Sequence, residues 1–153
     1  MREELVKLLI ERGLTISTAE SMTGGLVASS IVDISDASKV FSKGYVTYSD
    51  DAKVDMLGVN KKTIEKYGVV SHQIALEMAT GLYKKTGTDI CVCVTGSAGP
   101  NSYDGIEVGT VYIGFKILNK YYVSHIKVLN KGRNYIRQKT CDYIFSFLLE
   151  KLK

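Results

Sequence analysis

Residues 18–26 (Thr-Ala-Glu-Ser-Met-Thr-Gly-Gly-Leu) form the stretch whose residue types could do chemistry. A short run of strand-forming residues, 15–18, leads into hydroxyl- and glycine-rich positions, and a helical pattern follows over 26–32. The first N–H groups of a helix have no internal partner and carry the positive end of the helix dipole. Ser21 stands just ahead of these donors, so the turn suits an anion or an activated oxygen.

The residues alone leave two interpretations of this turn open. A serine that caps the helix, followed by turn glycines, would be a purely structural feature. Two consecutive glycines at a helix start favour a functional one, since Gly24 and Gly25 cost helix stability but let a ligand approach the backbone closely. We therefore treat Ser21, Thr23 and the two glycines as a candidate active-site or ligand-binding turn.

Tyr48 and Lys53 flank the start of a second predicted helix, 50–57. Lys53 falls in the first turns of that helix, where the dipole disfavours a cation. Together with partial burial, this would lower the lysine pKa towards a value useful for a base. The alternative is an exposed lysine whose charge is held by Asp50 or Asp51, and spacing alone favours that alternative.

Two further groups of residues could bind an anion. Arg133 and Arg137 lie one turn apart near the start of the last predicted helix, where guanidinium forks suit a phosphate or carboxylate. A solvated basic turn explains them equally well. The loop Thr95-Gly96-Ser97-Ala98-Gly99-Pro100 leaves the carboxyl end of an apolar strand, where open α/β sheets bind ligands. It matches neither the phosphate-binding P-loop nor the dinucleotide fingerprint.

Composition narrows the class of protein. The 153 residues are 45% hydrophobic and 24% charged, as in a globular protein, and we expect one domain over residues 1–153. No stretch has the apolar length of a membrane span or a signal peptide, which predicts a cytoplasmic protein with no membrane partner. The net charge of +4 comes from scattered lysines and predicts no nucleic-acid partner. Cys91 and Cys93 lie in an apolar run, which is typical of a buried strand. A metal site would need further cysteines or histidines at ligand spacing, and because the chain has two histidines we predict no metal site.

Alternating helical and strand patterns position these candidates. Helices are predicted over 3–12, 26–32, 50–57, from the Asn60 cap to Tyr67, from the Ser71 cap to Gly87, and from Arg133 onward. Strands are predicted over 15–18, 44–49, 89–95, 108–116 and 121–128, the last two joined by a tight turn at Asn119-Lys120. Strands alternate with helices until one hairpin interrupts. The fold class predicted is α/β, a three-layer α/β/α arrangement with a mixed, mostly parallel sheet.

In the same order, these segments resemble the C-terminal domain of the competence/damage-inducible protein CinA. The matching segments span nearly the whole chain: 18–25, 44–53, 57–59, 68–71, 95–100, 108–112 and Gly132-Arg133 with Ile136-Arg137. Stand-alone members of that family are nicotinamide mononucleotide deamidases. The resemblance implies hydrolysis of the carboxamide of nicotinamide mononucleotide to nicotinic acid mononucleotide and ammonia.

The resemblance also implies roles for individual residues. Ser21 would be the nucleophile, Lys53 the base and Tyr48 an assisting residue, which decides the lysine question in favour of the base. Tyr48 would either orient Lys53 or lie against the cationic pyridinium ring. No metal or organic cofactor is needed for this chemistry, and family members imply a homodimer or higher homo-oligomer.

Two groups of residues would bind the reaction intermediate and the phosphate of the substrate. Backbone N–H groups of Thr23, Gly24 and Gly25 would stabilise the tetrahedral oxyanion. The loop Thr95 to Gly99 would bind the phosphate together with Arg133 and Arg137. On that hypothesis, Arg137→Ala raises the Michaelis constant more than it lowers turnover.

The sequence departs from its relatives at a few positions. Met22 and Asp50 replace a cysteine and an asparagine, and Ile106-Glu107 replaces a basic residue and a proline at the end of a shortened loop. A glutamate pointing inward there would disfavour a phosphate. The alternative function is therefore a catalytically weakened pyridine-nucleotide-binding or regulatory module of the same fold, against which the intact candidate catalytic residues argue.

Overall fold

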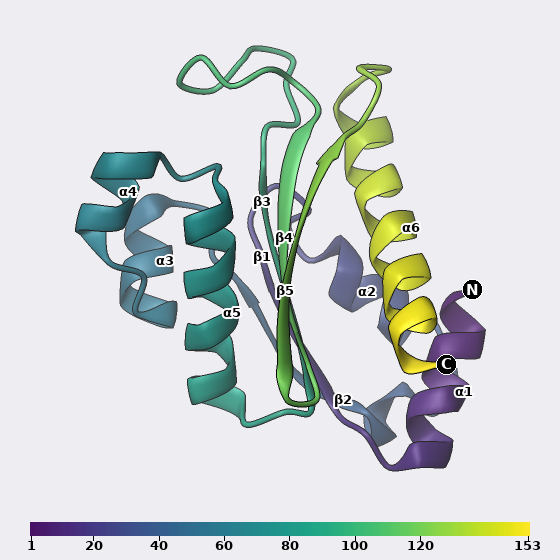
Figure 1. Ribbon diagram of the computed structural model, residues 1–153. Coiled ribbons are helices and arrows are strands. Elements are labelled where there is room, and N and C mark those ends of the chain that lie inside the picture. The colour runs from purple at the N-terminus through teal and green to yellow at the C-terminus, as the bar shows by residue number, and fades with distance from the viewer.

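A five-stranded sheet lies between two layers of helices in the computed structural model, which describes residues 1–153 (Figure 1). The strands are β1 (Ile16–Glu20), β2 (Phe41–Val46), β3 (Ile90–Gly96), β4 (Thr110–Ile117) and β5 (Lys120–Lys127). Their order in the sheet is β2-β1-β3-β4-β5. β1 pairs in parallel with β2 and β3, whereas β4 is antiparallel to both β3 and β5. Four strands thus run one way and β4 the other, which confirms the predicted mixed sheet.

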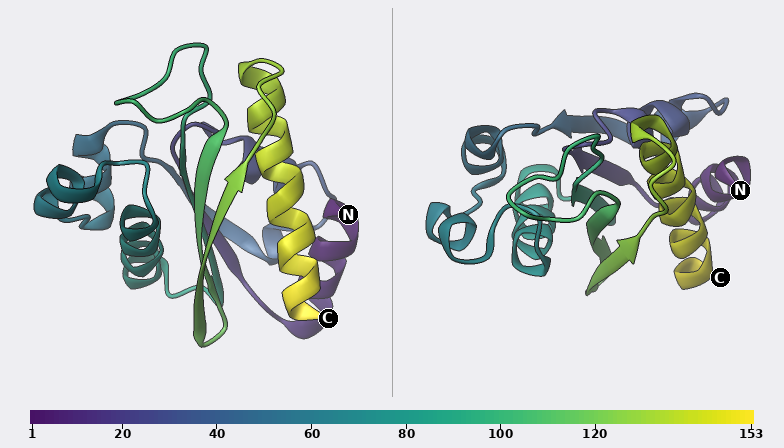
Figure 2. Two further views of the ribbon diagram at one scale, coloured as in Figure 1. Left: turned by 45° about the horizontal axis from the view of Figure 1, so that its top comes forward. Right: turned by 90° about the horizontal axis from the view of Figure 1, so that it is seen from above.

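The helices divide between the two faces of this sheet, as the view from above makes clear (Figure 2). One layer holds α1 (Arg2–Arg12), α2 (Leu26–Val32) and α6 (Arg133–Leu152). The other holds α3 (Asp50–Leu57), α4 (Lys61–Tyr67) and α5 (His72–Thr86); a short 3-10 helix, η1 (Ala37–Lys39), precedes β2. None of the helices is both long enough and apolar enough to cross a bilayer.

β3 supplies both hydrophobic cores. Its side chains alternate between the faces, so that Val92 and Val94 join the larger core beneath α1, α2 and α6. Cys91 and Cys93 join the smaller core beneath α5. All four side chains are fully buried, which is why this strand is an unbroken apolar run in the sequence.

Local signals set most helix boundaries where the sequence predicts them. Three helices begin after a residue whose side chain accepts an N–H from the first turn: Ser49, Asn60 and Ser71. Three end at a glycine in the left-handed helical conformation: Gly13, Gly58 and Gly87. The predicted turn at Asn119-Lys120 lies one residue earlier, at Leu118-Asn119, because Lys120 already pairs with Ile117 across the hairpin.

Two glycines let α5 pack without a gap against its neighbours. A Cβ on Gly81 would lie 1.8 Å from the carbonyl oxygen of Leu57, at the end of α3. A Cβ on Gly114 of β4 would lie 2.1 Å from the carbonyl oxygen of Ala75. No side chain fits at either position, so α5 lies directly on the sheet and α3 lies directly on α5.

One edge of the sheet gathers the ends of β1, β2 and β3 with the start of β4 and of α6, at the top of Figure 1. The predicted strand 44–49 stops earlier, at Val46, and residues 47–49 leave the sheet as a loop. The physical reason is the turn into α3, whose cap Ser49 bends the chain away. This carboxyl edge is where the candidate residues meet.

Candidate active site

Ser21 and Lys53 lie side by side at the carboxyl edge. The Lys53 Nζ atom is 3.1 Å from the Ser21 Oγ atom, within hydrogen-bond distance. The Ser21 backbone N–H donates to the carbonyl of Val94, which extends the β1–β3 pairing by one residue and fixes the serine relative to the sheet. Ser21 is 8% exposed and Lys53 only 1%, so this hydroxyl–amine pair is shielded from bulk water.

The amine of Lys53 has no carboxylate partner. Its Nζ donates instead to the backbone carbonyls of Thr47 (3.0 Å) and Tyr48 (3.3 Å), and no ion pair involves it. Burial lowers the pKa of Lys53 from 10.5 to about 8, partly opposed by the charge of Asp50. The exposed, carboxylate-paired lysine that spacing alone favours is therefore wrong, because packing against α5 turns this side of α3 inward.

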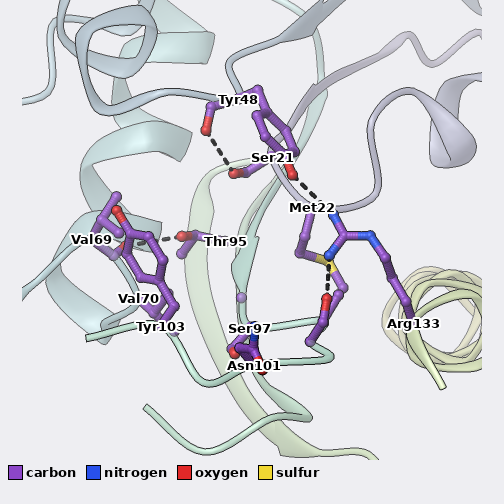
Figure 3. A pocket seen from close by; sticks show the side chains of 13 residues that line it. Ser21, Met22, Tyr48, Val69, Val70, Thr95, Ser97, Asn101, Tyr103 and Arg133 are labelled. Carbon is purple, nitrogen blue, oxygen red and sulfur yellow. Dashed lines mark hydrogen bonds between the residues drawn. The ribbon is translucent and has the colours of Figure 1, made fainter. Parts of the chain in front are cut away.

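Tyr48 contacts this pair through its backbone, not its ring. Its carbonyl oxygen lies 3.4 Å from Ser21 Oγ and accepts from Lys53, whereas its phenol oxygen accepts from Arg133 Nη2 at 2.9 Å (Figure 3). The side chain is 59% exposed. The two roles foreseen for Tyr48 thus fall on different atoms: the carbonyl positions the lysine, and the phenol stands at the pocket.

A pocket opens beside Ser21 between the β3–β4 loop, α6 and residues 69–70 (Figure 3). Met22, Val69 and Val70 give it an apolar side. The predicted loop Thr95 to Gly99 forms another side, and Thr95 itself is held in place by a hydrogen bond from its hydroxyl to the Val69 carbonyl at 2.9 Å. The structure therefore brings Ser21, Tyr48, this loop and Arg133 around one cavity.

Several hydrogen-bond donors around the pocket have no partner within the protein. The hydroxyl of Ser97 is 3% exposed and unpaired. The backbone N–H groups of Ala98 and Gly99, which line the pocket, donate to no protein acceptor. Buried polar groups are normally paired, so a cluster of free donors in a cavity is suited to an anionic or carbonyl ligand.

A buried carboxylate that sequence reasoning missed occupies the start of α2. Glu20 is 1% exposed and accepts from the N–H groups of Val27 (2.8 Å) and Ala28 (3.0 Å). The helix N-terminus expected to face a ligand is therefore already capped from inside. The available signal was a charged residue at the end of a buried strand, directly before Ser21.

The N–H groups of the Ser21 turn differ from one another in their bonding. The Gly24 N–H donates to the Ser21 carbonyl at 3.0 Å and is not available to a ligand. Those of Met22, Thr23 and Gly25 donate to no acceptor in the protein. Gly24 and Gly25 both have positive φ, at 57° and 101°, which is the conformation that favours glycine at these two positions.

The two arginines, predicted to act together, contact different parts of the site. Arg133 lines the pocket, where Nη1 donates to the Gly99 carbonyl at 2.5 Å and Nη2 to the Tyr48 phenol. Arg137 does not line the pocket. Its guanidinium donates to the carbonyls of Met22 and Thr23, both at 2.9 Å, on the other side of the turn.

Comparison with known proteins places this site in a family. The model of the CinA C-terminal domain matches residues 1–152. The chain belongs to the CinA C-terminal domain family. A CinA-like protein of Kosmotoga olearia is 46% identical over 153 residues, covering 99% of this chain and 37% of the relative. A relative from Clostridium botulinum is 42% identical over 155 residues, again across 37% of its length. The chain thus spans little more than a third of these curated relatives.

Solved structures of CinA-superfamily proteins share the fold over the whole chain. The competence/damage inducible protein CihA from Agrobacterium tumefaciens is 38% identical with a TM-score of 0.90, covering 97% of this chain and 94% of its own. The CinA-superfamily protein KP700603 from Klebsiella pneumoniae is 30% identical with a TM-score of 0.93, covering 99% and 98% of the two chains.

The loop before β4 leaves the pocket free of negative charge from Glu107. That side chain is 77% exposed and pairs with Lys127 at 2.8 Å, which lowers the pKa of the carboxyl. Glu107 does not line the pocket. The inward glutamate that would have disfavoured a phosphate is therefore not present.

Proposed function

We propose that this chain is a serine–lysine amidase that hydrolyses the carboxamide of nicotinamide mononucleotide to nicotinic acid mononucleotide and ammonia. The observation that carries the proposal is the buried Lys53 amine, 3.1 Å from the Ser21 hydroxyl and with a pKa lowered to about 8. An amine of that pKa is partly neutral near pH 7 and can accept the serine proton. Membership of the CinA family is consistent with a pyridine-nucleotide substrate.

The reaction proceeds in two halves. Neutral Lys53 takes the Ser21 proton as the Oγ atom attacks the carboxamide carbon, and the resulting oxyanion accepts hydrogen bonds from free backbone N–H groups of the turn. The lysine then gives its proton to the departing nitrogen, releasing ammonia and leaving a nicotinoyl ester on Ser21. Water, deprotonated by the same amine, hydrolyses the ester to the carboxylate and restores the serine.

The remaining pocket matches the other parts of the substrate. The apolar side formed by Met22, Val69 and Val70 suits the pyridine ring, and Tyr48, which lines the same pocket, suits its cationic face. The free donors of Ser97, Ala98 and Gly99, with the neighbouring Arg133, suit the phosphate.

Ammonia release from nicotinamide mononucleotide, measured in metal-free buffer, tests the proposal. Ser21→Ala and Lys53→Met are expected to lower turnover by roughly 10⁴-fold or more while calorimetry still detects substrate binding. Lys43→Ala, which removes an exposed lysine from β2, serves as the control for loss of positive charge. Activity that survives in Ser21→Ala means a different nucleophile, and an inactive wild type that binds the mononucleotide favours the regulatory module.

A further inference from the structure

The guanidinium of Arg137 holds the backbone directly after the candidate nucleophile. Its Nε atom donates to the Met22 carbonyl and its Nη2 atom to the Thr23 carbonyl, each at 2.9 Å. Its Nη1 atom donates to Asn134 at 3.1 Å, so all three nitrogens are engaged. These contacts join α6 to a turn that lies 114 residues earlier in the chain.

This contact determines where one free N–H group points. In a trans peptide the carbonyl of one residue and the N–H of the next point in opposite directions. Because Arg137 draws the Met22 carbonyl towards α6, the Thr23 N–H points away from α6. That N–H donates to no acceptor in the protein, and it belongs to the second residue after Ser21.

Other groups anchor the end of the turn where it enters α2. Glu20 holds the first amides of α2, and the Gly24 N–H is taken by the Ser21 carbonyl. The peptide between Met22 and Thr23 is therefore the part of the turn whose orientation depends on Arg137. The arginine side chain is only half-buried and bonds carbonyl oxygens, so it also places a positive charge behind that peptide.

We propose that Arg137 is a positioning residue that orients the Thr23 N–H as a donor to the oxyanion formed when Ser21 attacks, and that it does not bind the phosphate. This inference deepens the proposed amidase function and rests on it. It replaces the sequence-based hypothesis for Arg137 because all three guanidinium nitrogens already donate to protein acceptors, two of them on the turn.

The division between turnover and Michaelis constant tests the proposal. Arg137→Ala is expected to lower kcat on nicotinamide mononucleotide by about 10²-fold, the cost of one oxyanion donor, with a change in KM below about threefold. The same loss is expected on nicotinamide riboside, which lacks the phosphate. A raised KM on the mononucleotide with unchanged kcat, and no effect on the riboside, would overturn the proposal. Lys139→Ala, on an exposed turn of the same helix, is the charge-matched control.

Two companion variants separate positioning from folding. Arg137→Lys retains the charge but not the two-pronged contact, so its kcat is expected to fall between those of the wild type and Arg137→Ala while its thermal unfolding stays close to that of the wild type. Millimolar guanidinium added to Arg137→Ala is expected to restore part of kcat. A Lys variant with full kcat would contradict the need for the fork.

A readout that uses no pyridine nucleotide keeps this inference distinct from the amidase proposal. Ser21 Oγ attacks the phosphorus of a fluorophosphonate, its proton passes to Lys53 and fluoride leaves, which places a phosphonyl oxygen where the oxyanion would be. Mass spectrometry is expected to show Ser21 labelled at least tenfold more slowly in Arg137→Ala than in the wild type. If the wild type is labelled but releases no ammonia, the substrate assignment fails and the role of Arg137 stands. Equal labelling rates would overturn that role.

Discussion

The two edges of the sheet treat buried hydroxyl groups in opposite ways. At the amino edge, where β1 and β3 begin, the Ser17 hydroxyl bonds those of Thr86 (3.0 Å) and Thr88 (2.7 Å), and Thr88 also donates to the Ile90 carbonyl. At the carboxyl edge lie four of the five buried hydroxyls without a partner: Thr23, Thr47, Ser97 and Thr110. The amino edge satisfies these hydroxyls within the protein, and the carboxyl edge leaves four without a partner, of which Ser97 lines the pocket.

Two buried lysines show the same contrast. Lys116, 8% exposed at the amino edge, directs its amine to the Leu118 carbonyl and over the Tyr83 ring, 3.8 Å from the ring centre. Lys53 directs its amine to a serine hydroxyl at the carboxyl edge. An unpaired buried polar group costs about 1–3 kcal/mol, so the carboxyl edge gives up stability at these hydroxyls.

Replacement of each buried lysine by methionine is expected to give the largest difference in activity between the two edges. Lys53→Met is expected to lower ammonia release by about 10⁴-fold, because it removes the only amine beside Ser21. Lys116→Met is expected to leave kcat within about twofold of wild type, since its amine contacts only the hairpin turn and Tyr83. Steady-state assays on folded protein decide this, and a large loss in Lys116→Met would contradict the division between the edges.

As pH rises from about 8 to 10.5, the unfolding free energy of the wild type is expected to increase relative to that of Lys53→Met. In that window the folded amine has lost its proton while the unfolded amine keeps it, so the unfolded state binds more protons and unfolding becomes costlier. The difference in unfolding free energy should grow by about 1.4 kcal/mol per pH unit. Urea titrations of both proteins at pH 8, 9 and 10 measure it. A constant difference would mean that burial does not depress this pKa.

The same titration should govern the rate. Because the neutral amine is the active form, kcat/KM is expected to fall about tenfold per pH unit below pH 8 and to level off above it. Arg137→Ala should show the same dependence of kcat/KM on pH, with lower values at every pH. A profile flat from pH 6 to 9 would remove Lys53 from the role of base.

At the amino edge, Thr88→Val is expected to destabilise the protein by about 1–2 kcal/mol without changing kcat. The substitution removes a hydroxyl that bonds Ser17 and the Ile90 carbonyl, and so costs two hydrogen bonds within the protein. Chemical denaturation together with the ammonia assay checks both halves. A loss of kcat would show that the amino edge also takes part in the reaction.

The smallest effect is expected from Thr110→Val at the carboxyl edge. This hydroxyl is buried and has no partner, so its removal should change the unfolding free energy by less than about 0.5 kcal/mol, or raise it. Side-by-side melts with Thr88→Val sharpen the contrast. Equal destabilisation by the two variants would show that Thr110 is paired in solution.

Local rules accounted for the layered fold but not for which side chains meet. Capping residues such as Ser71 and the apolar run of β3 depend on neighbours in sequence, and both were predictable. The burial of Lys53 depends on how closely α3 approaches α5 at Gly81, a contact between distant segments that spacing does not encode.

The two arginines illustrate the same limit. Arg133 and Arg137 share a helix face, yet one long side chain reaches the Gly99 carbonyl and the other the Met22 carbonyl. Only the position of the Ser21 turn beside α6 decides between them. Glu20 was missed for a related reason, since its acceptor role appears once α2 is placed against the end of β1.

The carbonyl oxygens of Thr47 and Tyr48 that hold the lysine amine belong to the main chain, and every amino acid carries one. A library of single substitutions at these two positions would therefore underreport how much the reaction depends on them. Removal of one residue between Val46 and Asp50 would redirect both oxygens at once. Replacement of the amide bond after Thr47 or Tyr48 by an ester would make that carbonyl oxygen a weaker hydrogen-bond acceptor. The length and backbone path of this loop determine where the two oxygens lie, and single substitutions do not test either property.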